Sequence, residues 1–257
     1  GSLAHRLLRL LAKLDAGGCR KVIALSPEMA ARASAYFPKA EWAPLWGDDA
    51  MRALSRDDPE VLALRRERGW AEGELVALYS GNMGLGHDIG AFLEASLLTG
   101  PAVRWVFCGG GPRRREVEDF IAAHPEARVE LIPYAPREKL ALHLASADVL
   151  LTSMRPEWNG TLTPSTAVNA FVAGRPLLYA VPEGDMLSGW IVESGAGWVV
   201  RPGDSSGMAA ILSAAAADKA SLPNPDAIRA WYDTRLSHAA GCARMADLIE
   251  SMLQLEG

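Results

Sequence analysis

The chain has 257 residues, of which 49% are hydrophobic and 22% are charged, and this composition excludes a disordered or fibrous protein. Its 26 lysines and arginines stand against 31 aspartates and glutamates, and the net charge of -5 argues against a dedicated nucleic-acid binder. We therefore expect a globular chain with a sizeable core and no nucleic-acid partner.

The cysteines and the apolar runs indicate the compartment. Cys19, Cys108 and Cys242 lie far apart and show neither a disulfide framework nor the spacing of a zinc site. No apolar run reaches the roughly 18 residues of a membrane span, and no charged segment precedes a cleavable apolar run. These features predict a cytoplasmic protein. The initial Gly1-Ser2 resembles the remnant of a cleaved tag, which suggests a piece of a longer protein.

The first 50 residues are interpreted as a fragment of another domain followed by a linker. Leu3 to Leu14 has leucines at helical spacing with basic residues beside them, which predicts an amphipathic helix. A short strand over Val22 to Leu25 and a helix from Pro27 follow. A loose, proline-containing stretch then runs up to Glu74.

From Glu74 onward, short apolar runs alternate with helical patterns, which is typical of a doubly wound parallel sheet. The predicted strands are 75–79, 103–108, 129–132, 149–152, 177–180 and 197–200. The predicted helices lie near 87–98, 113–123, 137–145, 164–173 and 186–194. The sequence thus predicts an α/β fold with a six-stranded, Rossmann-like parallel sheet, whose ligands gather at the carboxyl ends of the strands.

The C-terminal part predicts two more helices. An alanine-rich helix follows Asp204 and ends near Ala217, Pro223-Asn224-Pro225 marks a break, and a last helix runs from about Ser237 to Leu253. We place the boundaries of a binding domain at 51–236 and assign 237–257 to a separate C-terminal helix.

Three loops after predicted strands could carry chemistry. The first, Ser80 to Asp88, is rich in glycine and opens a helix, so its amides and the helix dipole can face an anion. A plain strand-to-helix turn is the alternative, because the spacing is not the dinucleotide fingerprint. The second, Gly109 to Arg115, places three arginines at a helix start, where they could attract a phosphate or simply lie on a solvated face.

The third loop, Ser153 to Thr166, is long and polar and leads into a helix, which makes it a good anion cradle. Thr163 is expected to cap that helix with Pro164 at its first position, so part of the pattern is explained by capping alone. Arg155 and Arg175 are candidate anion partners, but a structural ion pair is the simpler interpretation of each.

The ordered set of motifs resembles the C-terminal, donor-binding half of a GT-B glycosyltransferase, in the large retaining family (group 1, or family 4) that includes many bacterial surface-polysaccharide enzymes. The resemblance spans about residues 74 to 255 and is carried by segments 78–88, 109–112, 131–140, 145–149, 159–176 and 200–204. Segments 24–29 and 43–49 are similar to the end of the family's N-terminal domain and to its interdomain linker. The resemblance implies that the acceptor-binding N-terminal domain is largely missing, so that this chain alone binds a donor without turning it over.

The resemblance also implies a site for a nucleotide-diphosphate sugar of the UDP or GDP type. The residues implied near the diphosphate are Gly81, Asn82, Gly84, His87, Pro164, Ser165 and Thr166. Those implied near the sugar are Asn159, Gly160, Thr161 and Leu162, and those beside the base and ribose are Tyr134, Ala135, Pro136 and Asn169. No metal or other cofactor is expected, because two helix N-termini would converge on the pyrophosphate.

The chain departs from the family at positions that often carry Glu, Lys and Glu, where it has Asn159, Thr166 and Asn169. Glu157 is a candidate to replace the first acid, and no nucleophile can be named. Losing the lysine removes a positive charge from the expected phosphate site. A non-catalytic nucleotide-binding or regulatory module is therefore an alternative. A sugar-nucleotide epimerase-like enzyme is a third, which the absence of paired acids and a histidine in the third loop disfavours.

The amphipathic helix within residues 3–14 has two interpretations. Its leucines can pack on the missing domain, or its leucine and basic faces can lie on an anionic membrane that carries lipid-linked acceptors. The exposed stripe of a truncated chain could also drive self-association.

Overall fold

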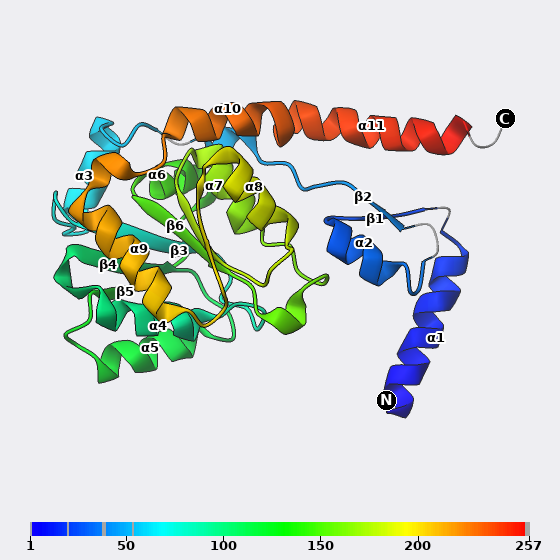
Figure 1. The fold of residues 1–257 in the computed structure, drawn as a ribbon, viewed down its shortest axis with the longest axis horizontal. Helices are drawn as coiled ribbons and strands as arrows, with labels where there is room; N and C mark the ends of the chain where they lie inside the picture. The colour runs from blue at the N-terminus through cyan, green and yellow to red at the C-terminus, as the bar shows by residue number, and fades with distance from the viewer. Residues whose placement is uncertain (1, 20, 38–39, 53, 255–257) are drawn as a thin grey trace.

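Six parallel strands form the centre of the molecule. The computed structural model describes residues 2–19, 21–37, 40–52 and 54–254. The strands follow the order β5-β4-β3-β6-β7-β8 (Figure 1). They are β3 (Leu75–Ser80), β4 (Val103–Cys108), β5 (Val129–Ile132), β6 (Val149–Ser153), β7 (Leu177–Ala180) and β8 (Gly197–Val200). The predicted α/β fold with a six-stranded parallel sheet is confirmed, and every strand ends within one residue of its predicted end.

Helices cover both faces of this sheet, because successive side chains of a strand point to opposite faces. In β3, Leu75 and Tyr79 join one buried cluster, whereas Val76 and Leu78 join the other. Helices packed on the first face are α4 (Ile89–Leu98), α5 (Arg114–Ala123) and α9 (Ser205–Ala217). Those on the second face are α6 (Leu140–Ala145), α7 (Ser165–Ala173), α8 (Met186–Ser194) and α10 (Pro225–Arg235).

The N-terminal segment lies beyond the carboxyl ends of the sheet strands (Figure 1). It contains α1 (Leu3–Gly17), β1 (Val22–Ala24), α2 (Pro27–Ala33) and β2 (Ala40–Trp42), and β1 pairs with β2 in parallel. Arg32 Nη1 donates a hydrogen bond to the carbonyl of Asn159 at 3.2 Å. A Cβ on Gly160 would lie 2.9 Å from the carbonyl oxygen of Glu28. The segment therefore contacts the third loop of the sheet domain.

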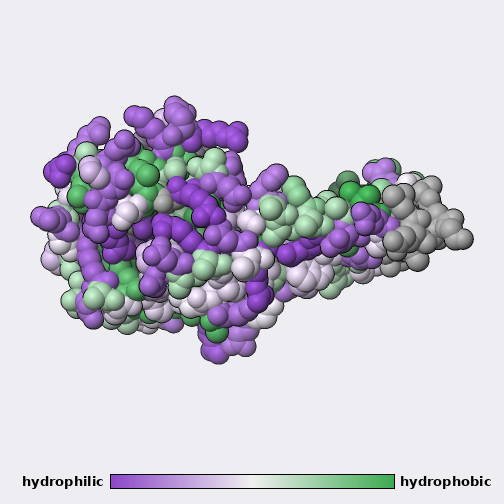
Figure 2. Space-filling model, turned by 90° about the horizontal axis from the view of Figure 1, so that it is seen from above, coloured by the Kyte–Doolittle hydropathy of each residue, from purple (hydrophilic) through white to green (hydrophobic). Residues whose placement is uncertain are grey.

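The C-terminal helix α11 (His238–Gln254) continues from α10 and reaches beyond the sheet (Figure 1). The segment between β2 and α3 packs against these helices. Gly47 N donates to the carbonyl of Leu236 at 2.9 Å, and the Trp46 and His238 rings meet edge to face. In the view from above, hydrophilic side chains cover much of the broad end, whereas hydrophobic ones are interspersed along the narrower arm (Figure 2).

Three elements differ from the sequence prediction: β2, α3 (Pro59–Glu67) and α10 were not expected. The expected break at Pro223-Asn224-Pro225 is present, because α9 ends at Ala217. The helix that follows it was missed: the Asn224 side chain accepts from Asp226 N at 2.8 Å and caps α10. The remaining short 3-10 turns are η1 (Asp49–Met51), η2 (Gly100–Ala102), η3 (Arg137–Lys139), η4 (Pro156–Trp158) and η5 (Lys219–Ser221).

The domain boundaries at residues 50 and 236 remain a prediction. Gly1 of the expected tag remnant and residues 255–257 of the expected last helix lie outside the described residues. Within the described ranges, no helix is both long enough and apolar enough to cross a membrane.

Candidate donor-binding site

One cavity at the carboxyl ends of the strands brings residues of the first and third loops together with residues that follow β5. Its volume is about 370 Å³. It is lined by Ser80, Gly81, Asn82, His87, Tyr134, Ala135, Leu140, Leu162, Thr163, Pro164, Ser165, Thr166 and Asn169. Ser80, Leu140 and Thr163 were not among the candidate site residues, although the loops and segments singled out in the sequence contain them.

The glycine turn after β4 supports the first loop. Gly81 N donates to the carbonyl of Cys108 at 3.0 Å, and Met83 N donates to that of Gly110 at 2.6 Å. A Cβ on Gly109 would collide with the carbonyl oxygen of Gly81, so only glycine permits this approach. The second loop, Gly109 to Arg115, thus holds the first loop in place and does not itself line the cavity.

The three arginines after this turn all pair with acids of α5. The pairs are Arg113 with Glu116, Arg114 with Glu118 and Arg115 with Asp119. The interpretation of a solvated face therefore holds for Arg115, which is exposed, whereas Arg114 also donates to the carbonyl of Gly109 at 2.7 Å. Arg113 is more buried, and its Nη1 donates to the carbonyl of His87 at 3.0 Å, a positioning contact that sequence reasoning missed.

His87 joins the first loop to the start of the third. Its Nδ1 lies 2.6 Å from the carbonyl oxygen of Ser153, and because a carbonyl only accepts, Nδ1 carries a proton. Burial lowers the pKa of His87, and the Arg113 charge lowers it further against the effect of the Ser153 bond. The neutral ring therefore leaves Nε2 as an acceptor at pH 7, and this nitrogen can donate to an anion only after taking up a proton.

The N-terminus of α7 has no side-chain cap. The helix begins at Ser165, and Pro164 occupies the capping position in an extended conformation. The expected cap by Thr163 is wrong: its Oγ1 is buried and finds no partner among the described residues. Because the helix starts one residue later than expected, Pro164 displaces the threonine from the capping position.

The first amides of α7 are consequently available to a ligand. In the part of the chain that the structure describes, the N–H groups of Ser165 and Thr166 meet no acceptor, and both residues line the cavity. The positive end of the helix dipole lies at the same place. The cavity therefore offers oriented donors to an anion.

The cavity holds no fixed charge. Among the described residues that line it, none is a lysine, arginine, aspartate or glutamate. Thr166 turns its hydroxyl toward Thr152 at 2.8 Å, and a Cβ on Gly81 would lie 3.0 Å from its methyl group. An anion here would be met by amides, hydroxyls and His87.

Several candidate residues lie outside this cavity. The carbonyl of Asn159 and the backbone of Gly160 face α2, and Thr161 donates its hydroxyl to the carbonyl of Trp158 at 2.8 Å. Glu157 is exposed and lies 3.9 Å from Arg155, so the expected ion pair of Arg155 is present.

Gly84 closes a turn in which its N–H donates to the carbonyl of Asn82 at 2.9 Å. The expected convergence of two helix N-termini is also not what the structure shows. The first-loop helix α4 begins at Ile89, and none of its residues lines the cavity. The first residues of α7 line the cavity, as does Leu140 at the start of α6, whereas His87 and Asp88 turn toward Ser153 before α4 begins.

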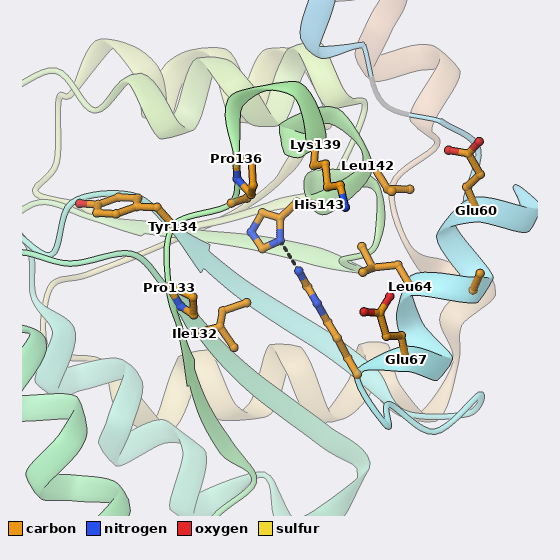
Figure 3. Close-up of a pocket in the computed structure, with 13 residues that line it drawn as sticks. Glu60, Leu64, Glu67, Ile132, Pro133, Tyr134, Pro136, Lys139, Leu142 and His143 are labelled. Atoms are coloured by element: carbon orange, nitrogen blue, oxygen red, sulfur yellow. Dashed lines mark hydrogen bonds between the residues drawn. The ribbon is translucent and has the colours of Figure 1, made fainter.

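A second cavity of about 580 Å³ lies between α3, α6 and the loop after β5, and Pro136 lines this one (Figure 3). Tyr134 and Ala135 line both cavities, so this loop separates them. Figure 3 shows the ring of Tyr134 on the side of the loop away from His143.

His143 and Arg68 form the floor of this second cavity, with 3.1 Å between Nη2 and Nδ1. Arginine only donates, so the His143 proton lies on Nε2. Burial lowers the pKa of His143 to about 3. Neither His143 Nε2 nor Arg68 Nη1 has a partner among the described residues. No sequence pattern links two residues so far apart in the chain.

The described residues contain no group of histidines, cysteines and acids that could hold a metal ion.

The comparisons with known proteins add to this geometry. No family model matches the sequence. WbjE, a probable glycosyltransferase of Pseudomonas aeruginosa, is 24% identical over 219 residues, which cover 82% of this chain and 53% of WbjE.

Two solved structures share the fold. Anabaena HepE, in complex with UDP and glucose, matches with a TM-score of 0.79 and 18% identity over 95% of this chain and 66% of HepE. WaaG, a glycosyltransferase involved in lipopolysaccharide biosynthesis, matches with a TM-score of 0.69 and 17% identity over 88% of this chain and 62% of WaaG. The chain has the fold of a GT-B glycosyltransferase domain. This confirms the fold that the ordered motifs implied. The GT-B domain spans about half the length of its curated relative and no more than 66% of these solved chains.

Proposed function

We propose that this GT-B domain is the donor-binding half of a glycosyltransferase and that the cavity before α7 holds the diphosphate of a nucleotide sugar. The observation that carries the proposal is the uncapped start of α7. Its two free amides at Ser165 and Thr166 face a cavity that the glycine loop closes at Gly81. A helix N-terminus with open amides is a ready anion site.

A uridine nucleotide is the first ligand to test. HepE was solved with UDP and glucose and with UDP-glucose. The backbone at Tyr134 and Ala135 would flank the base, with Leu140 and Leu162 supplying apolar surface nearby. A guanosine nucleotide is the alternative, since the asparagine and hydroxyl side chains among the described lining can hydrogen-bond either base.

Transfer would proceed with retention, as in the family that the motifs resemble. The cavity supplies no carboxylate from its described lining, so its part in the reaction is to bind the donor and to stabilise the departing diphosphate through the α7 amides. The acceptor would be held by another part of a longer protein, and this chain alone would bind without turnover.

The acceptor would be a glycan or lipid-linked glycan of a surface polysaccharide. WaaG acts in lipopolysaccharide biosynthesis, and WbjE is a probable glycosyltransferase. Helix α1 exposes Leu3, Leu7 and Leu14 beside basic residues and could contact an anionic membrane from the cytoplasmic side, where such acceptors lie. Packing against the rest of the protein, or self-association, is the competing use of the same leucines.

The decisive experiment is isothermal titration of the chain with UDP, GDP and ADP, followed by sugar conjugates of the best nucleotide. Ser165→Trp should abolish binding because the indole fills the cavity mouth. Ser206→Trp, an exposed serine at the start of α9, is the matched control and should bind like the parent. Equal binding by both variants, or none by the parent, would overturn the proposed site.

A non-catalytic nucleotide-binding module is the second candidate, and the absence of fixed charge in the cavity favours it. Thr166 and Asn169 replace charged residues of the family, so the cavity lacks charges that would stabilise a leaving diphosphate. Nucleotide binding without glycosyl transfer by the longer protein, across acceptors that serve its relatives, would favour this candidate. Nothing in the cavity favours an epimerase-like enzyme.

A further inference from the structure

A third pocket lies at the amino ends of the strands, opposite the candidate donor cavity. Its volume is about 280 Å³, and it lies between the loop before α3, Arg175 ahead of β7, η5 and the start of α10. Its charged lining consists of the cations Arg56, Arg175, Lys219 and Arg229 and the carboxylates Asp57 and Asp226.

The cations are recessed, whereas the carboxylates lie on the rim. Arg175 is 1% exposed, and the side chains of Arg56 and Lys219 are 28% and 27% exposed. By contrast, the side chain of Asp226 is 90% exposed. Charges at the surface are screened by water and salt, whereas recessed ones are screened less. The interior of the pocket is therefore more positive than the count of its charges suggests.

Arg175 has a donor that the protein leaves unmet. Its Nη2 donates to the carbonyls of Leu54 at 3.1 Å and Ala145 at 2.8 Å. The buried Nε of Arg175 has no hydrogen-bond partner among the described residues. No acidic side chain among those residues forms an ion pair with the Arg175 guanidinium. The ion pair expected for Arg175 from the sequence is thus wrong. A buried donor without a partner costs free energy unless a ligand or water satisfies it.

The one buried acid nearby is already shared. Asp148 is 1% exposed and contacts Arg65 at 3.1 Å, Arg56 at 3.4 Å and Lys219 at 3.6 Å. It also accepts the N–H of Val76 at 2.8 Å. One carboxylate cannot neutralise three cations, so the cluster keeps a surplus of positive charge beside the pocket.

We propose that this pocket binds a phosphate dianion. Guanidinium groups hold phosphate through paired hydrogen bonds. The pocket is lined by three of them beside an ammonium group, and one of the three, Arg229, is already paired with Asp226 at 3.2 Å. Its volume suits inorganic phosphate or a small phosphate ester, since pockets for larger ligands begin at about 300 Å³. The site is separate from the proposed function, because α7, nine residues and about 14 Å long, lies between this pocket and the donor cavity.

The test is a calorimetric titration of the full chain with inorganic phosphate. The ionic strength is held constant, and chloride serves as the competing anion. Arg56→Gln, which removes one of the recessed cations, should weaken binding about tenfold. Arg137→Gln is the matched control, because Arg137 is 90% exposed and lies outside the pocket. It should bind phosphate like the parent. Thermal unfolding without phosphate establishes that each variant is folded.

Ser165→Trp separates this pocket from the donor cavity, where phosphate could also bind. The proposal requires that Ser165→Trp keeps phosphate binding and that Arg56→Gln keeps nucleotide binding. Phosphate binding lost in Ser165→Trp but kept in Arg56→Gln would place the anion in the donor cavity and overturn the proposal. Equal weakening by Arg56→Gln and Arg137→Gln, or no saturable binding by the parent, would overturn it as well.

Discussion

Replacing Ser165 with proline removes a single backbone donor from the start of α7, and we expect the fold to tolerate it. Ser165 is the first residue of the helix and is exposed. Proline is favoured at this position, where the amide has no partner within the helix. The preceding residue already has the extended conformation that proline demands, with φ of -66° and ψ of 112°.

The size of the effect follows from the bond that is lost. A hydrogen bond from an amide to a charged group contributes about 1.5 to 3 kcal/mol. Deleting the Ser165 amide should therefore raise the Kd for UDP about tenfold to 150-fold. The helix dipole and the Thr166 amide remain, so binding should weaken without disappearing.

Ser165→Ala is the matched control, because it removes the hydroxyl and keeps the amide. Calorimetric titration with UDP should give the alanine variant a Kd near that of the parent and the proline variant a much higher one. Thermal unfolding should be similar for all three proteins. If the proline and alanine variants bind equally, the α7 amides do not contact the diphosphate and the reasoning from the uncapped helix fails.

Three further predictions test the charges around both cavities. Thr166→Lys should lower the Kd for UDP by about three- to tenfold by restoring a cation to the cavity, while Thr166→Met, of similar length, should not; equal calorimetric affinities would contradict this. UDP affinity should rise as pH falls from 8 to 6, because His87 must be protonated to donate from Nε2; a His87→Gln variant with the same pH dependence would contradict this. The pKa of His143 is about 3 when folded and about 6.5 when unfolded, so its stabilising effect is present above pH 6.5 and is lost as pH falls. Between pH 7 and 5 this loss is about 2 kcal/mol in urea unfolding, and a His143→Gln variant with an equally steep pH profile would refute it.

The strands were predictable because parallel strands buried on both faces read as continuous apolar runs. All residues of β3 from Leu75 to Tyr79 are fully buried, and β7 is buried throughout. Helix α3 was missed because four of its nine residues are charged and it lies in a proline-containing stretch. Helix α10 was missed because Asn224 before Pro225 was interpreted as a break, although a capping asparagine before a proline also marks a helix start.

The sequence predicted which loops form the candidate site, but it did not predict how their side chains are oriented. Glycine spacing and strand ends indicated which loops would meet, and Gly81, Tyr134 and Ser165 do line one cavity. Sequence could not show that Thr166 turns its hydroxyl toward Thr152, because that choice depends on the packing between β6 and α7.

At both ends of α7, the neighbouring groups fit the direction of the helix dipole. At its C-terminus, Arg229 Nη2 donates to the carbonyl of Ala173 at 3.3 Å, where a cation is favourable to the helix dipole. At its N-terminus, no acidic side chain caps the helix, so the positive end of the dipole is left for a ligand. A protein that needed α7 only for packing would gain about 1 kcal/mol from a capping serine or aspartate at residue 164. Pro164 forgoes that gain, and the free amides it leaves are the strongest physical reason to expect an anion there.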